Sequence, residues 1–168
     1  KMDCNILKRP KKFANNKSTA NQVIHHFLSK INLSLNDIII YLQPTSPCRH
    51  YIHIDKSLRL FNKLKKPVIS VTKNQEVILK SYLIKGPRLI SPYKKNYYNF
   101  NRQDLPVTYK SNGAIYIFTK KQFLKVNGFP NNDVVGYIMD KSDSYDIDNK
   151  DNLKNVKQNL IKNKKKYL

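Results

Sequence analysis

Cysteine is scarce in this chain, and its scarcity excludes two common architectures. The 168 residues contain two cysteines, Cys4 and Cys48, which lie far apart and outside any C-x-x-C spacing. A structural zinc site needs closely spaced ligands, and a disulfide framework needs several cysteines in a short chain. Neither is predicted, and a reducing, cytoplasmic environment is the expectation.

Glycine and long apolar runs are also scarce. The four glycines form no G-x-S-x-G, no Walker-type loop and no G-x-G-x-x-G, so serine-hydrolase, phosphate-loop and dinucleotide-binding functions lack their motifs. No apolar stretch approaches the length of a membrane span, and residues 1–5 lack the apolar core of a signal peptide. A soluble protein without a membrane partner is therefore expected.

Acidic residues are few: 11 stand against 32 basic ones, which gives a formal charge of +21. Such a charge favours nucleic-acid binding through phosphate contacts. However, 27 of the basic residues are lysines spread along the whole chain, and asparagine, isoleucine and tyrosine are abundant as well. These are residues of A/T-rich codons, so composition explains the charge without a partner. A nucleic-acid-binding module remains the alternative, and residues 162–168 are expected to form a basic tail.

The hydrophobic pattern predicts one α/β domain, since 168 residues support one sizeable core. Helices are predicted from Ser18 through about Phe27, over 52–64, over 119–126 and after Asp148. Strands are predicted from Ile38, over 68–71, over 114–118 and over 134–139. The strand, helix and strand between 38 and 71 predict a parallel pair with a right-handed crossover.

The predicted strand at Ile38 ends abruptly in a polar loop that contains two prolines. Ligands of parallel α/β sheets bind beyond the carboxyl ends of the strands, so Gln43, Thr45, Ser46 and Arg49 are expected to line a crevice. Short neutral groups of this kind suit a polyhydroxylated ligand. An ordinary stiff turn is the alternative.

Asp146 and Asp148 are the second candidate site. In an extended segment, residues two apart point to the same side, so both carboxylates could bind one hard cation. Magnesium takes one or two carboxylates and fills its other positions with water and phosphate oxygens, as in phosphoryl and nucleotidyl transfer. The alternative is an acidic turn that caps the following helix.

Three other features are weaker. Arg102 could hold a carboxylate through its bidentate fork or be a surface arginine. The four histidines are His25 and His26 on the first predicted helix and His50 and His53 around the start of the second. They have no spaced cysteine or glutamate partner and are expected on helix faces or at the surface rather than on a metal. Residues 73–109 combine prolines with clustered tyrosines, which is typical of a protrusion or a subunit contact.

Several short motifs occur in one order along residues 9–151. They are Arg9-Pro10, Ser18-Thr19, Q-P-T-S-P at 43–47, R-Q-D-L-P at 102–106, N-G-A-I-Y at 112–116 and S-Y-D-I-D at 144–148. In this order they resemble the acylneuraminate cytidylyltransferases, which are the CMP-sialic acid synthetases and their relatives. The resemblance implies an α/β fold with a three-layer Rossmann-like sheet of the nucleotide-diphospho-sugar transferase type.

The resemblance also implies a reaction and a homodimer. The anomeric hydroxyl of a nonulosonic, sialic-type acid attacks the α-phosphate of CTP, pyrophosphate leaves, and Mg²⁺ stabilises the developing charge. Residues 1–161 would be a partial cytidylyltransferase domain, with 73–109 as a protruding dimerisation segment. The implied CTP contacts are Arg9, Ser18 and Thr19; the implied sugar contacts are Gln43, Thr45, Ser46, Lys80, Arg102, Asn112 and Tyr116; the implied catalytic metal ligands are Asp146 and Asp148.

One departure from the family pattern bears on activity. The family opens with a loop of the form A-R-x-G-S-K that cradles the triphosphate, and no such loop occurs here. An N-terminally truncated fold is therefore expected, and the chain alone should turn over CTP poorly or not at all. A partial gene, a split enzyme and a non-catalytic sugar-acid-binding relative are the explanations that remain open.

Overall fold

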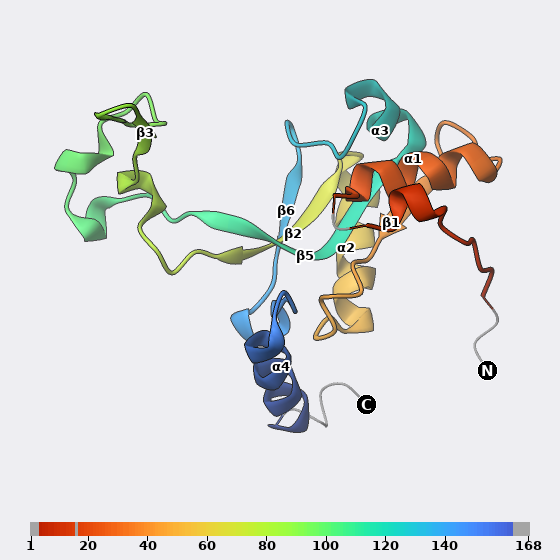
Figure 1. Ribbon diagram of the computed structural model, residues 1–168. Helices are drawn as coiled ribbons and strands as arrows, with labels where there is room; N and C mark the ends of the chain where they lie inside the picture. The colour runs from red at the N-terminus through yellow and green to blue at the C-terminus, as the bar shows by residue number, and fades with distance from the viewer. Residues whose placement is uncertain (1–3, 16, 163–168) are drawn as a thin grey trace.

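The computed structural model describes residues 4–15 and 17–162 (Figure 1). The helices are α1 (Ala20–Lys30), α2 (Tyr51–Leu64), α3 (Lys120–Val126) and α4 (Lys150–Lys162). The strands are β1 (Ile38–Tyr41), β2 (Val68–Lys73), β3 (Leu83–Lys85), β4 (Arg88–Ile90), β5 (Tyr109–Thr119) and β6 (Val135–Ile138). Every helix and strand predicted from the sequence is present within a few residues. The basic tail lies outside the described residues beyond Lys162.

The main sheet is mixed, with the strand order β1-β5-β2-β6. Strand β5 is antiparallel to both β1 and β2, and β6 is parallel to β2. The α/β prediction is confirmed, but the predicted pairing of the first two strands is wrong, because β5 lies between them. The strand-helix-strand connection fixes the common direction of β1 and β2 without fixing what separates them. Strand β5 takes the inner place because both of its faces are apolar and residues 112–115, 117 and 118 are buried.

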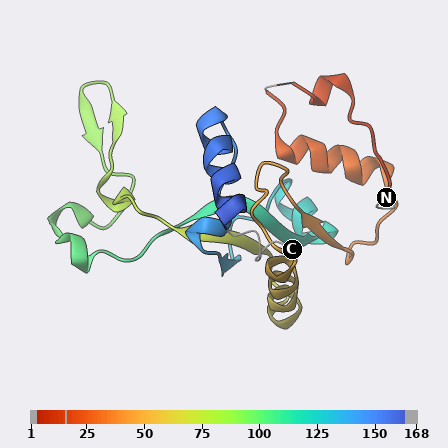
Figure 2. The same ribbon diagram turned by 90° about the horizontal axis from the view of Figure 1, so that it is seen from below.

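The sheet has one apolar core on each face. Ile39 and Phe118 face one side, where they pack with Ile24 of α1 and Phe123 of α3. On the other side β-strand residues such as Ile117 pack against α2. The alternation follows from the two-residue period of strands, which sends neighbouring side chains to opposite faces. Figure 2 shows the result as three layers, with the sheet between α1 and α2.

Helices α1 and α3 begin with the same capping motif. Thr19 caps α1 and Thr119 caps α3, and in each case a glutamine three residues later completes a reciprocal capping box. The predicted cap, Ser18, is displaced by one residue because only Thr19 has the glutamine Gln22 at the required spacing. The Ser18 hydroxyl instead bonds the side chain of Asn15.

Residues 73–109 extend away from the sheet and carry the β3–β4 hairpin at their far side (Figure 1). No residue of this segment is buried, and both hairpin strands are exposed along their whole length. Its role as a dimerisation segment stays a prediction. Within the part of the chain that the structure describes, no helix combines the length and the apolar character needed to cross a bilayer.

Candidate functional site

The two loops predicted to form a site lie side by side. The backbone N–H of Ile147 donates to the carbonyl of Thr45 at 2.9 Å, which ties loop 144–148 to loop 43–49. Beside this contact a cleft of about 730 Å³ opens where β2 and β6 end and β5 begins. It is lined by Thr72, Lys73, Asn74, Gln75, Glu76, Ile78, Tyr109, Lys110, Ser111, Asn112, Lys141, Ser144, Tyr145, Asp146, Asp148 and Asn152. The position beyond the carboxyl ends of parallel strands is the one expected for a ligand.

Asp146 and Asp148 both line this cleft. Oδ1 of Asp146 is buried, and among the described residues it has no hydrogen-bond partner. The cap of α4 belongs to a different residue, because Asn149 Oδ1 accepts the N–H of Asn152 at 2.8 Å. A buried carboxylate oxygen without a partner is costly unless a ligand or ion occupies its open side. The pair of carboxylates therefore fits a hard cation better than it fits the helix-cap alternative.

The protein groups supply only part of a coordination sphere. Within the described ranges, no group of three or more histidine, cysteine, aspartate or glutamate side chains could hold a metal ion. Magnesium is bound in this way at many phosphate-handling sites, through one or two carboxylates with water and substrate oxygens completing the octahedron. The donor set thus suits a cation that arrives with a phosphate ligand.

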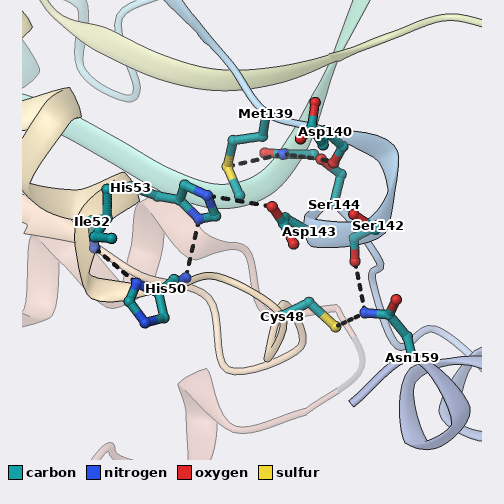
Figure 3. A network of polar contacts seen from close by, with 11 residues as sticks. Cys48, His50, Ile52, His53, Met139, Asp140, Ser142, Asp143, Ser144 and Asn159 are labelled. Atoms are coloured by element: carbon teal, nitrogen blue, oxygen red, sulfur yellow. Dashed lines mark hydrogen bonds and ion pairs between the residues drawn. The ribbon is translucent and has the colours of Figure 1, made fainter. Parts of the chain in front are cut away.

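Asn112 links the cleft to the core. Its Oδ1 accepts from the Ser70 hydroxyl at 2.6 Å, and its amide donates to Ser144 Oγ at 2.9 Å and to Met139 Sδ at 3.3 Å. Ser144 in turn donates to the carbonyl of Asp140 at 2.7 Å, a contact drawn in Figure 3. Asn112 is only 5 % exposed. This predicted sugar contact therefore also joins β2, β5 and the loop that carries the aspartates.

Arg49 and Ser46 stabilise the 43–49 loop through hydrogen bonds to backbone carbonyls. The Arg49 guanidinium donates to the carbonyls of Gln43, Ser46 and Ala114 at 2.6, 2.9 and 3.4 Å. Burial lowers the pKa of Arg49, yet arginine remains charged at neutral pH. Ser46 is fully buried, and its hydroxyl donates to the carbonyl of Asn112 at 3.4 Å. Arg49, expected to line the crevice, instead fixes the shape of the loop.

Gln43 lies against Gly113 at the start of the buried part of β5. Gly113 has φ +73°, and a Cβ at that position would come within 2.3 Å of Gln43 Oε1. Burial raises the pKa of the Tyr41 hydroxyl, and the nearby Gln43 side chain opposes this shift. Tyr116 pairs with Ser111 Oγ at 2.9 Å and its ring lies 6.0 Å from that of Tyr41. Gln43 and Tyr116 thus adjoin Tyr41, while Asn112 faces the aspartate cleft.

Replacing Gly113 by alanine should destabilise the fold by about 2–3 kcal/mol, because the left-handed backbone is strained and the new methyl group displaces Gln43. The matched control is Gly86→Ala, since Gly86 has φ +59° and no atom of the described residues lies within 4 Å of its Cβ position. That control carries only the backbone cost of about 1 kcal/mol. Urea denaturation measures both changes. Equal losses in the two variants would show that the contact with Gln43 is not a tight one.

The remaining predicted residues lie outside the cleft lining. Burial raises the pKa of the Tyr41 hydroxyl and the charge of Arg9 opposes this shift only slightly, so Arg9 lies within electrostatic reach of that hydroxyl. Ser18 bonds the side chain of Asn15, and Thr19 caps α1. Lys80 donates to the carbonyl of Phe100 at 2.6 Å within the projecting segment. Arg102 lines a neighbouring cavity of about 330 Å³, whose wall at residues 73–76 also borders the aspartate cleft.

Sequence reasoning missed two groups of residues around the site. Lys73, Lys110 and Lys141 line the cleft, and only their basic character could have drawn attention to them. Asn159 of α4 donates to the carbonyl of Ser142 at 2.8 Å and to Cys48 Sγ at 3.5 Å (Figure 3). These two contacts require α4 to fold back onto loop 43–49 and onto the turn Lys141–Asp143, for which the sequence carries no local signal.

Comparisons with known proteins agree with this geometry. No family model matches the chain. An N-acylneuraminate cytidylyltransferase of Escherichia coli O18:K1:H7 is 33 % identical over 147 residues, which are 86 % of this chain and 34 % of the relative. N-acylneuraminate cytidylyltransferases of Streptococcus agalactiae serotypes V and III are 27 % identical over 160 residues, which are 90 % of this chain and 36 % of each relative.

The chain thus spans about a third of the length of the curated relatives it matches. The matched stretch covers most of the chain, and the motifs at 43–47, 112–116 and 144–148 meet at one place in the fold. Over most of its length this chain is similar to N-acylneuraminate cytidylyltransferases, the family that its motifs resemble.

Proposed function

We propose that this chain is part of a cytidylyltransferase that transfers CMP from CTP to a sialic-type sugar acid and releases pyrophosphate. The printed names of the relatives support the reaction class. The observation that carries the proposal is the buried Oδ1 of Asp146, which has no hydrogen-bond partner among the described residues and lies in a cleft that Asp148 also lines. The sheet is accordingly proposed to be of the nucleotide-diphospho-sugar transferase type.

Asp146 and Asp148 would hold a magnesium ion. When bound, such an ion neutralises charge on the phosphates and on the departing pyrophosphate. The chain sets the positions of the two carboxylates, because the hydrogen bond from the Ile147 N–H to the Thr45 carbonyl fixes the backbone between the two aspartates. A preformed arrangement of this kind needs no reorganisation when charge develops.

The lysines of the cleft would attract both anionic substrates. Lys73, Lys110 and Lys141 lie on its lining, where they balance the charges of Glu76, Asp146 and Asp148. A cation held by the two aspartates would leave the cleft with an excess of positive charge, which raises the local concentration of anions. Arg102 would clamp the sugar carboxylate from the adjoining cavity through its bidentate fork. Gln43 and Asn112 would bond sugar hydroxyls, and a homodimer built on residues 73–109 remains part of the proposal.

The test is pyrophosphate release from CTP and N-acetylneuraminic acid with Mg²⁺. It compares this chain with a version extended upstream in its own gene. We expect release that requires both substrates and the cation, at least in the extended form. Sugar-acid binding that needs neither CTP nor Mg²⁺, without turnover, would favour a non-catalytic relative. Silence in both forms together with salt-sensitive RNA binding would contradict the proposal and favour the nucleic-acid alternative.

A further inference from the structure

A buried contact between a histidine and an aspartate joins helix α2 to the loop that carries Asp146 and Asp148. His53 Nε2 lies 3.4 Å from Asp143 Oδ2 (Figure 3), and the side chains of these residues are 13 % and 2 % exposed. Asp143 ends the 3-10 turn Lys141–Asp143, three residues before Asp146. An ionised carboxylate buried this deeply requires a polar partner, and a lost partner is costly. The pair therefore constrains where this turn can lie.

The His53 ring is itself held in one orientation. Its Nδ1 accepts the backbone N–H of His50 at 3.0 Å, as the second half of the capping box at the start of α2. Since Nδ1 acts as the acceptor, the ring proton of neutral His53 resides on Nε2 and points to Asp143. The rigid helix thereby presents a fixed donor to the loop.

The loop has separate attachments along its length. The N–H of Asp143 bonds the carbonyl of Asp140 at 3.1 Å, the Ser144 hydroxyl is bonded by Asn112 at 2.9 Å, and Ile147 bonds Thr45. The two latter contacts tie the loop to β5 and to the loop 43–49. His53 ties the same loop to α2. Both His53 and Asp143 line a separate cavity of about 350 Å³, which Lys56, Tyr137 and Asp140 also line.

We propose that His53 is a positioning residue that acts through Asp143. It holds residues 143–148 against α2, so that the carboxylates of Asp146 and Asp148 are presented to the cleft. His53 does not line the aspartate cleft, so it reaches a cation only through the loop. The consequence for cation binding rests on the proposed function, whereas the effect on the loop does not. Partners of metal ligands typically change metal affinity 10- to 100-fold when they are removed.

The experiment compares two amides at position 53. His53→Asn keeps an acceptor near the place of Nδ1 for the cap of α2 but does not extend to Asp143. His53→Gln extends to the place of Nε2 and keeps a donor for Asp143. The control is Thr119→Ala, which removes a helix cap from α3, an element that contributes no residue to the cleft. Two quantities are measured: amide hydrogen exchange of Ile147 without metal, and Mn²⁺ affinity from the paramagnetic resonance signal of the free ion.

In His53→Asn we expect exchange at Ile147 to accelerate about tenfold and the Mn²⁺ dissociation constant to rise about tenfold. His53→Gln should recover most of both, and Thr119→Ala should change neither. Unchanged exchange in His53→Asn, or equal changes in Thr119→Ala, would overturn the positioning role. Faster exchange with unchanged Mn²⁺ affinity would overturn it as well. If the unaltered chain binds no Mn²⁺, the cation site of the proposed function fails, and exchange at Ile147 still decides whether His53 holds the loop.

Discussion

Asp146→Asn should reduce pyrophosphate release at least about a thousandfold and abolish most of the affinity for Mn²⁺. Asparagine keeps the size of the side chain but removes the charge that a hard cation requires. A loss of about 4 kcal/mol of transition-state stabilisation, which is within the range supplied by bound metal ions, corresponds to three powers of ten in rate. Stability should fall little, because the buried Oδ1 of Asp146 has no partner to lose among the described residues.

The effect is measured in the upstream-extended form of the protein, or in this chain if it is active by itself. Initial rates at saturating CTP report turnover, and Mn²⁺ titrations report cation binding. The control is Asp55→Asn, because Asp55 is an exposed residue of α2 whose carboxylate lies 3.0 Å from Arg59. It removes one negative charge away from the cleft and should leave the rate within about twofold, as expected for exposed pairs. An Asp146→Asn protein with near-normal turnover would remove this residue from the catalytic machinery.

Asn112→Leu should lower the free energy of unfolding by about 2–4 kcal/mol. Leucine has a similar volume but no polar group, so the Ala114 N–H loses the oxygen that it contacts at 3.3 Å. The hydroxyls of Ser70 and Ser144 lose their contacts with the same side chain. Buried polar groups left without a partner cost about 1–3 kcal/mol each, and the sum is reduced where another acceptor lies near.

Chemical denaturation with an unchanged m-value would establish this loss. Ser111→Ala is the matched control, one position earlier on β5, where the side chain is exposed and bonds only the Tyr116 hydroxyl in the described structure. An exposed substitution of this kind should cost about 0.5 kcal/mol or less. Similar losses at both positions would mean that Asn112 serves the cleft without supporting the fold.

The secondary structure followed from local pattern, and its errors have local or topological causes. The cap of α1 shifted from Ser18 to Thr19 because two adjacent hydroxyls compete and only one has Gln22 three residues later. The neighbours of β1 could not be deduced, since hydrophobic periodicity reports which face of a strand is buried and not which strand lies beside it. The apolar character of β5 on both faces was the available sign of an inner strand.

Much of the candidate site could be anticipated because polar residues that follow strands gather at one edge of a sheet. Loop 43–49 and loop 144–148 meet as this rule expects. The rule does not say which loop residues face inward, so Arg49 was assigned to the crevice although it bonds backbone carbonyls. Nor could the pairing of His53 with Asp143 be foreseen, because the two residues are far apart in sequence and share no motif.

The place of β5 in the sheet also dictates the order in which the protein can fold during synthesis. Strand β1 has β5 as its one neighbour in the described sheet, and Ile38 pairs with Thr119, roughly 80 positions later. Until that part of the chain leaves the ribosome, the apolar residues of β1 lack this partner strand and depend on local cover from α1. Such distant pairings slow folding. Strand β1 is therefore made long before its partner β5 and is paired late, and the nascent chain should need protection from aggregation throughout that interval.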